Sequence, residues 1–136
     1  MTQIKDKTDQ QLNRALAELM GYTIYHYDKD VAERCYFELT DPDGYPEIVF
    51  GGERNTELEA WADVPNYCND PAASLEVQTA ACKERFYWYI QALSKVVGAD
   101  GYWDSGALDY EGITLLLTAS PREWAEAAYI TLSSAK

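Results

Sequence analysis

Few residues of this chain could carry chemistry, and none stands in a known catalytic arrangement. The only histidine, His26, lies between two tyrosines in a stretch of strand-forming residues, with no cysteine close to it in sequence. Histidine is the usual acid–base residue of enzymes, but this setting favours a hydrogen-bonded structural role. Phosphate-binding, dinucleotide-binding, serine-hydrolase and zinc-protease motifs are absent from the sequence. We therefore expect a protein that is not an enzyme.

The three cysteines, Cys35, Cys68 and Cys82, are widely spaced and include no C-x-x-C pair. This pattern is typical neither of a disulfide framework nor of a zinc site. We predict three buried free thiols in a reducing cytoplasm, with no metal and no cofactor. Asp-Gly segments at 41–44 and 100–101 resemble calcium-loop fragments, but they lack the closing glutamate and are predicted to be turns.

Carboxylates are the abundant charged groups. The 136 residues include 23 acidic and 11 basic side chains, for a net charge of −12, and residues 38–70 alone have a net charge of −8. Because nucleic acid is bound through lysine and arginine, direct nucleic-acid binding is not expected. The same charge would attract a basic protein surface, or it serves only solubility. The carboxylates predicted to face a partner are Glu38, Asp41, Asp43, Glu47, Glu53, Glu57, Glu59 and Asp63.

Aromatic residues are a second resource, because the chain has 11 tyrosines and 4 tryptophans. Such side chains supply large contact area at interfaces and are also ordinary core residues. Trp88 falls on the polar side of a predicted helix, with Glu84, Gln91 and Lys95, so it either packs under another element or meets a partner. The predicted aromatic contact residues are Trp88, Tyr102 and Trp103.

Helix-capping residues and the periodicity of apolar residues predict the helices and strands that position these side chains. A capping box at Thr8 and Gln11 predicts a helix over 9–20, which Gly21 ends. Residues 56–61 form either a short helix or an irregular loop. Strands are predicted at 22–27, 35–39 and 47–50, with a turn at 41–44.

The longest predicted element is a helix over 71–97, which Asp70 and Pro71 begin and Gly98 ends. One stripe at helical spacing is predicted to pack on the sheet: Leu75, Thr79, Cys82, Phe86, Tyr89, Ile90, Leu93 and Val97. Replacing Phe86 by alanine would then cost about 3–5 kcal/mol.

The last part of the chain predicts a strand at 113–117 and a helix at 121–133, which begins with a Ser120–Glu123 capping box. That helix is expected to bury Trp124, Ala128 and Leu132 and to expose Arg122, Glu123 and Glu126. The whole pattern predicts one α+β domain over 1–136, an α-β-α layered sandwich with a largely antiparallel sheet and three main helices. No apolar run approaches the roughly 18 residues of a membrane span.

The chain also resembles a known family, through short motifs that span nearly its whole length. These are Leu19-Met20-Gly21-Tyr22, the Pro-Asp-Gly turn, Trp61, Val64-Pro65-Asn66-Tyr67, Asn69-Asp70, Ala72, Glu76, Tyr89, Leu93, Val97-Gly98 and the 118–127 segment. They are similar to those of the small phage-encoded proteins grouped as the phage ABA sandwich domain. The resemblance implies an α–β–α sandwich and a bacteriophage or prophage origin, and it implies no activity. The 98–112 segment is longer, and the middle more acidic, than the family pattern.

Charge and resemblance together favour a phage accessory protein that binds a host protein in the cytoplasm of an infected bacterium, without membrane contact. The most concrete version is an anti-defence inhibitor of the anti-CRISPR kind. Its carboxylates would mimic nucleic acid and occupy a basic groove built for phosphates in a nucleic-acid-binding defence complex.

Other functions stay open. The chain could be a small-molecule protein that sequesters a nucleotide, a self-assembling phage structural or regulatory protein, or a catalytic fold without a known motif. A nucleotide needs cations, and six of the 11 basic residues lie in or beside the first two helices and could cluster: Lys5, Lys7, Arg14, Lys83, Arg85 and Lys95.

Overall fold

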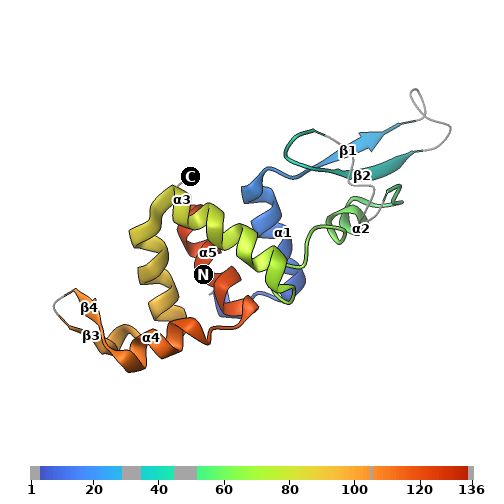
Figure 1. Ribbon diagram of the computed structural model, residues 1–136. Helices are drawn as coiled ribbons and strands as arrows, with labels where there is room; N and C mark the ends of the chain where they lie inside the picture. Colours follow the sequence, from blue (N-terminus) through green and yellow to red (C-terminus); the bar gives the residue numbers. More distant parts are fainter. Residues whose placement is uncertain (1–3, 29–34, 45–51, 105, 135–136) are drawn as a thin grey trace. The chain divides into compact units, whose positions relative to one another are not determined.

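The computed structural model describes residues 4–28, 35–44, 52–104 and 106–134. They belong to two compact units, one formed by residues 13–65 and the other by residues 1–12 together with 66–136. We call the first the acidic unit, because it has 12 acidic and 4 basic side chains, and the second the helical unit. Among the described residues, five α-helices and two two-stranded antiparallel sheets confirm the α+β class (Figure 1). The single domain and the layered sandwich stay predictions.

Helix α1 (Asp9–Met20) begins in the helical unit and continues into the acidic unit. Its predicted capping box is confirmed, because the Thr8 amide donates to Gln11 Oε1 at 2.9 Å and the Gln11 amide donates to Thr8 Oγ1 at 3.1 Å. This exchange satisfies two amides that the first helical turn leaves without partners. Gly21 follows the helix with a φ of 102°, in the left-handed region that glycine adopts without steric cost.

The acidic unit is built on a hairpin of β1 (Thr23–Tyr27) and β2 (Tyr36–Thr40), which confirms two of the predicted strands. Aromatic and β-branched residues favour the extended backbone here. The strands are antiparallel, and their register places Tyr25 opposite Glu38. Because successive side chains alternate between the faces of a strand, the sequence of each strand divides into two faces.

Helix α2 (Glu57–Trp61) shows that the 56–61 segment is a short helix rather than a loop. The Thr56 hydroxyl caps it by accepting a hydrogen bond from the Glu59 amide at 3.1 Å. Just before this helix, the backbone of Arg54 pairs with Phe37 of β2 through two hydrogen bonds of 2.8 Å. The third strand, predicted at 47–50, lies outside the described residues.

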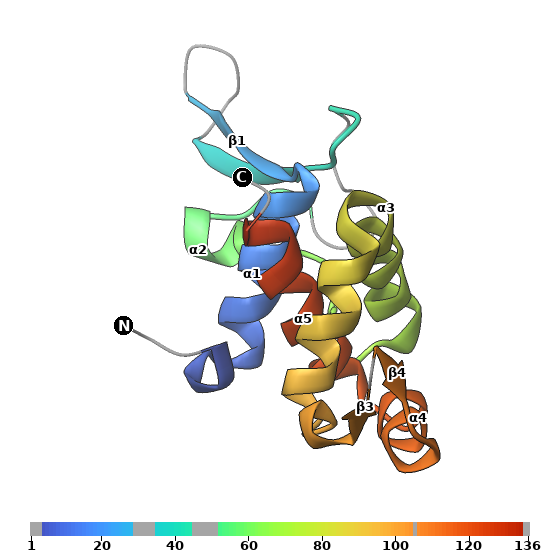
Figure 2. The ribbon, with the colours of Figure 1, turned by 90° about the vertical axis from the view of Figure 1, so that its left-hand side faces the viewer.

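The helical unit is organised by α3 (Pro71–Val96), the longest element as predicted, and by α5 (Pro121–Ser134), which packs against it (Figure 2). Both predicted starts are confirmed, because Asp70 accepts from the Ala72 amide and Ser120 exchanges hydrogen bonds with Glu123. Buried apolar side chains of the two helices fill much of the core: Ala73, Val77, Ala81, Tyr89, Ala92, Leu93, Val96, Ala125, Ala127, Ala128 and Leu132.

Helix α3 is kinked at Arg85, whose φ of −151° and ψ of 74° are not helical. The buried face before the kink includes Val77 and Ala81, and the buried face after it includes Tyr89 and Leu93. In an unbroken helix of 3.6 residues per turn, Ala81 and Tyr89 would lie about 80° apart around the axis. The kink therefore joins two helical segments whose buried faces differ in phase.

The predicted apolar stripe is wrong because it assumed a single phase. Leu75 and Phe86 are 54% and 65% exposed, whereas Tyr89 and Leu93 are buried as predicted. Among the described elements, the main packing partner of α3 is α5 and not a sheet. The expected loss of about 3–5 kcal/mol for Phe86→Ala is withdrawn, because that cost applies to a core side chain.

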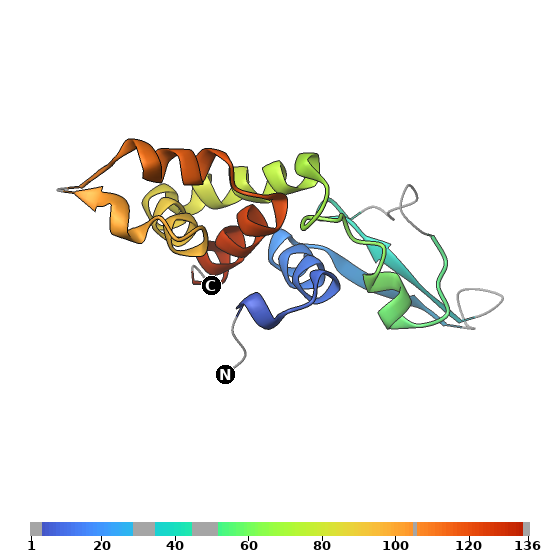
Figure 3. The same cartoon turned by 90° about the horizontal axis from the view of Figure 1, so that it is seen from below.

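The predicted strand at 113–117 is wrong as well, because helix α4 (Tyr110–Leu117) covers it. Asp109 caps this helix by accepting a hydrogen bond from the Gly112 amide at 2.9 Å. Gly112 is buried, and a Cβ there would lie 2.7 Å from the Leu108 side chain, so glycine allows the helix to pack closely. The only extended pieces nearby in the described chain are the short strands β3 (Trp103–Asp104) and β4 (Ala107–Leu108) (Figure 3).

The face of α5 also differs from the prediction. Ala128 and Leu132 are buried as expected, but Trp124 is only half-buried. Glu126, which was expected to be exposed, is buried, and Arg122 and Glu123 are half-buried. Arg122 Nε donates to Glu126 Oε2, and its Nη1 donates to Asp9 Oδ1, both at 2.8 Å. The same guanidinium donates to the backbone carbonyl of Lys7 at 2.8 Å. A buried carboxylate is tolerated here because this arginine neutralises it.

Candidate binding surfaces

All eight carboxylates predicted to face a partner belong to the acidic unit. Four are exposed: Asp43, Glu53, Glu57 and Glu59. Glu38 and Asp41 are half-buried, and Glu47 lies outside the described residues. Glu57 and Glu59 stand in the first turn of α2, where the positive end of the helix dipole favours negative side chains. The exposed carboxylates around α2 are therefore compatible with the local backbone.

Asp63 differs from the other predicted carboxylates because it holds an arginine. Arg54 Nε donates to Asp63 Oδ2 at 2.8 Å and Arg54 Nη2 donates to Asp63 Oδ1 at 2.9 Å, a two-point pair. These hydrogen bonds, which Asp63 accepts, raise the pKa of Arg54 above its usual value. The Asp63 side chain is only 9% exposed. Its first role is therefore to hold the segment that leads into α2.

Arg14, the other described arginine of the acidic unit, also has partners within the unit. Arg14 Nε donates to Glu18 Oε1 at 2.9 Å, one helical turn away. Its guanidinium also lies over the Trp61 ring, 4.8 Å from the centroid. Both arginines in the described part of the unit are therefore engaged within it, although the unit has 12 acidic side chains.

One face of the hairpin gathers tyrosines beside a carboxylate. Alternation along the strands places Tyr25, Tyr27, Tyr36 and Glu38 on the same face. The rings of Tyr27 and Tyr36 stack at 4.4 Å, and those of Tyr25 and Tyr27 meet at 4.5 Å. Partial burial, followed by the charge of Glu38, raises the pKa of Tyr27 above its ordinary value. We call this set the tyrosine face.

The tyrosine face was missed as a candidate surface in the sequence. Period-two alternation and an antiparallel register, both available from the sequence pattern, would have placed Tyr25 next to Glu38. On the opposite face of the hairpin, His26 stacks on Phe37 with ring centroids 4.5 Å apart. His26 is exposed, so the expected role of a hydrogen-bonded histidine becomes one of aromatic stacking.

The three predicted aromatic contact residues differ in how far they are exposed to solvent. Trp103 is half-buried and its indole donates to Ser94 Oγ at 3.1 Å. Tyr102 is half-buried too, and its Cβ lies next to Gly112 of α4. These two residues connect elements of the helical unit. Trp88, in contrast, is 58% exposed.

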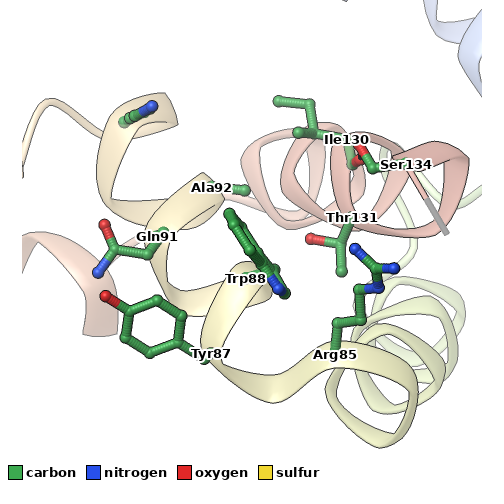
Figure 4. Close-up of a pocket in the computed structure, with 9 residues that line it drawn as sticks. Arg85, Tyr87, Trp88, Gln91, Ala92, Ile130, Thr131 and Ser134 are labelled. Carbon is green, nitrogen blue, oxygen red and sulfur yellow. Dashed lines mark hydrogen bonds between the residues drawn. The ribbon is translucent and has the colours of Figure 1, made fainter.

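Trp88 lines a groove of about 590 Å³ between α3 and α5, within the helical unit. The lining residues are Arg85, Tyr87, Trp88, Gln91, Ala92, Lys95, Ile130, Thr131 and Ser134. Figure 4 shows that Arg85 and Trp88 extend from α3 toward Thr131 of α5, whereas Tyr87 and Gln91 lie on the other side of Trp88. The groove begins at the kink, because Arg85 is the residue with non-helical backbone angles.

The cysteines occupy three different environments, so the prediction that all are buried is wrong. Cys35 is exposed, Cys82 is half-buried and Cys68 is buried, and all three are free thiols. Burial raises the pKa of the Cys68 thiol to about 11, although Arg122, whose Nη1 lies 3.8 Å from the sulfur, acts in the opposite direction. A thiol with a raised pKa is a poor nucleophile at neutral pH.

The described residues contain no group of three or more histidine, cysteine, aspartate or glutamate side chains that could hold a metal ion. None of the helices in these ranges has the length and apolar character that crossing a bilayer requires. The chain matches no family model, no curated protein and no solved structure. Among the described residues, the groove, the tyrosine face and the exposed carboxylates are the surface features that could bind a partner or a ligand.

Proposed function

We propose that the chain is a phage accessory protein that uses its acidic unit to bind a basic surface on a host protein. The net negative charge of that unit carries the proposal. Its sequence has 12 acidic and 4 basic side chains, and the two described arginines already hold Glu18 and Asp63. A surface with such an excess of one charge attracts the opposite charge over several ångströms and accelerates association.

The tyrosine face supports binding to a protein rather than to a small cation. Tyrosine brings a large rigid area with a hydroxyl at its end, and protein interfaces are enriched in it. Tyr25 is 54% exposed and stands opposite Glu38, so an apolar contact and a charged contact lie side by side. Interface energy usually concentrates in a few such aromatic residues, while the surrounding charges set orientation and rate.

In the proposed mechanism, the chain inhibits the host protein by occupying its nucleic-acid-binding surface. Carboxylates spaced over a compact surface would neutralise lysines and arginines that otherwise hold phosphates, so the host protein would lose its nucleic acid. The resemblance to the phage ABA sandwich domain supports the phage setting, in which an anti-defence inhibitor of a nucleic-acid-binding complex is the most concrete form of this function.

The test is to capture partners from a bacterial host lysate with the tagged full chain, and then to purify the captured protein. Its binding to duplex DNA is measured with increasing amounts of the chain. We expect the chain to displace DNA, because both would occupy the same basic surface. Capture without displacement of nucleic acid contradicts the proposed mechanism.

A charge-matched pair of variants makes the experiment specific. Glu53→Lys/Glu57→Lys/Glu59→Lys reverses three exposed carboxylates of the acidic unit, whereas Glu76→Lys/Glu84→Lys/Glu111→Lys reverses three exposed ones of the helical unit. Both variants change the net charge by the same amount. We expect only the first to lose the partner. Equal losses would mean that net charge alone, and no particular surface, governs capture.

A further inference from the structure

The groove at the kink of α3 differs in charge from the rest of the molecule. The chain has a net charge of −12, yet Arg85 and Lys95 line the groove and no carboxylate is among its described lining residues. A cationic hollow in an acidic protein concentrates small anions locally. The acidic unit contributes no residue to it. Because the groove is positively charged, its ligand should be an anion and not the basic partner proposed above.

We propose that this groove binds a small anionic ligand with an aromatic ring, of the nucleotide class. The volume of about 590 Å³ lies within the roughly 300–1,000 Å³ of small-molecule sites. Trp88, 58% exposed, offers a flat ring on which a base can stack. Arg85 offers a planar fork that matches phosphate oxygens, and Lys95 adds a second positive charge.

The polar groups of the groove are of two kinds, hydrogen-bond acceptors and hydrogen-bond donors. The hydroxyls of Thr131 and Ser134 donate to the backbone carbonyls of Ala127 and Ile130, at 2.9 and 2.7 Å. Their protons are thereby used, so toward the groove these oxygens can only accept hydrogen bonds. They suit a base amino group or a ribose hydroxyl. Arg85, Lys95 and the Gln91 amide can donate, and the two cations among them suit a phosphate.

The kink at Arg85 accounts for the position of this groove on α3. In an unbroken helix, Trp88 would lie within about 20° of Val77 and Ala81, on the face that the first segment of α3 buries. The change of phase at Arg85 leaves Trp88 exposed instead, where it lines the groove together with Ala92 and with Ile130 and Thr131 of α5. A long nucleic acid is disfavoured, because the helical unit as a whole has 11 acidic and 7 basic side chains and would repel a polyanion.

The experiment is a titration of the full chain with adenosine monophosphate, followed by calorimetry and by tryptophan fluorescence. Adenosine, which lacks the phosphate, and inorganic phosphate, which lacks the ring, are titrated in parallel. The variants are Trp88→Ala, Arg85→Gln and Lys95→Gln. Lys83→Gln is the matched control, because Lys83 is exposed on the same helix and does not line the groove. A thermal melt of each variant shows that it is folded.

We expect saturable binding of adenosine monophosphate, weakened by about tenfold or more in Trp88→Ala and Arg85→Gln and unchanged in Lys83→Gln. Adenosine and phosphate should each bind more weakly than the nucleotide. Because Trp88 is one of four tryptophans, the fluorescence change should disappear in Trp88→Ala while the calorimetric signal reports the residual binding.

Several results would overturn the proposal. One is the absence of saturable binding by the adenosine, guanosine, cytidine and uridine monophosphates up to about 10 mM, which is weaker than a specific site. Another is an equal loss in Lys83→Gln, which would indicate diffuse attraction. A third is self-association of the chain that Trp88→Ala abolishes, which would assign the groove to an interface between copies. None of these results bears on the acidic unit, so the proposed function fails or stands separately.

Discussion

The helical unit and the acidic unit differ in whether they bury polar side chains. The four buried polar residues among the described ones, Ser74, Ser94, Glu126 and Thr131, all belong to the helical unit. Each has a partner: Ser74 donates to the Tyr67 carbonyl, Ser94 accepts from Trp103, Glu126 holds Arg122, and Thr131 donates to its own helix. The described part of the acidic unit has no polar residue in this class.

The difference indicates that buried charged groups stabilise the fold, whereas exposed ones can bind a partner. A buried carboxylate is tolerable only when hydrogen-bonded and neutralised, so its partners are fixed by the fold. An exposed carboxylate adds little to stability and stays available to a partner. Substitutions of the buried polar residues should therefore destabilise the helical unit, whereas substitutions of the exposed carboxylates of the acidic unit should alter binding and leave the fold intact.

The largest expected effect concerns the core of the helical unit and the phase change at the kink. Tyr89 is buried and its hydroxyl donates to Gln78 at 2.7 Å, so Tyr89→Ala should lower the free energy of unfolding by about 3–5 kcal/mol. Phe86→Ala, three residues earlier, should cost less than about 1 kcal/mol because Phe86 is exposed. Denaturant unfolding measures both. Similar losses for the two variants would contradict the kinked helix.

The next effect tests the buried charge. Arg122→Ala leaves Glu126 buried without its cation and also removes the hydrogen bonds to Asp9 and Lys7, so we expect a loss of about 2–4 kcal/mol. Arg122→Lys should recover only part of this stability, since one ammonium cannot reproduce the fork of a guanidinium. Full recovery with lysine in chemical denaturation would show that charge alone holds this cluster.

A smaller effect is expected from the buried thiol of Cys68. Its pKa in the fold is about 11, above the ordinary value of 9.0, because burial disfavours the thiolate. The unfolded chain therefore loses this proton first, so stability is complete below pH 9 and falls as the pH rises through about 11. Cys68→Ala should flatten the early part of that decline in thermal melts at a series of pH values. An unchanged pH profile in the variant would rule out this contribution.

The smallest effect on folding is expected from the exposed carboxylates of the acidic unit. Glu53→Lys/Glu57→Lys/Glu59→Lys should change the free energy of unfolding by no more than about 1 kcal/mol in total, because exposed charges are screened by water and salt. Reversing Asp63 to lysine should cost more, because Asp63 holds Arg54. If the triple variant unfolds as easily as the Asp63 variant, the exposed carboxylates have a structural role that the contacts do not reveal.

Local signals predicted much of this fold. Capping residues fixed the starts of three helices, at Thr8, Asp70 and Ser120, because a cap is a contact between neighbours in sequence. The hairpin strands followed from their aromatic and β-branched residues in the same way. These are interactions that a short window of sequence contains.

Long-range packing explains what could not be predicted. Nothing in the residue type of Arg85 announces a kink, since neither proline nor glycine stands there, and its conformation depends on how α3 meets α5. The 113–117 segment has strand-like residues, but the Asp109 cap and the buried Gly112 place it in a helix. The groove depends on both helices at once, so only residues of α3, namely Arg85, Trp88, Gln91 and Lys95, could be singled out in advance.

The most direct test of the account is the association rate of the captured partner with the chain, measured at low and at high salt. We expect the rate for the wild-type chain to fall steeply as salt rises, because a Debye length of about 8 Å at physiological ionic strength screens the acidic unit. The Glu53/Glu57/Glu59 reversal should associate slowly at both salt concentrations, and the Glu76/Glu84/Glu111 reversal should keep most of the wild-type rate and its salt dependence. A wild-type rate that is independent of salt, and that the first reversal leaves unchanged, would contradict the claim that the acidic unit is the binding surface.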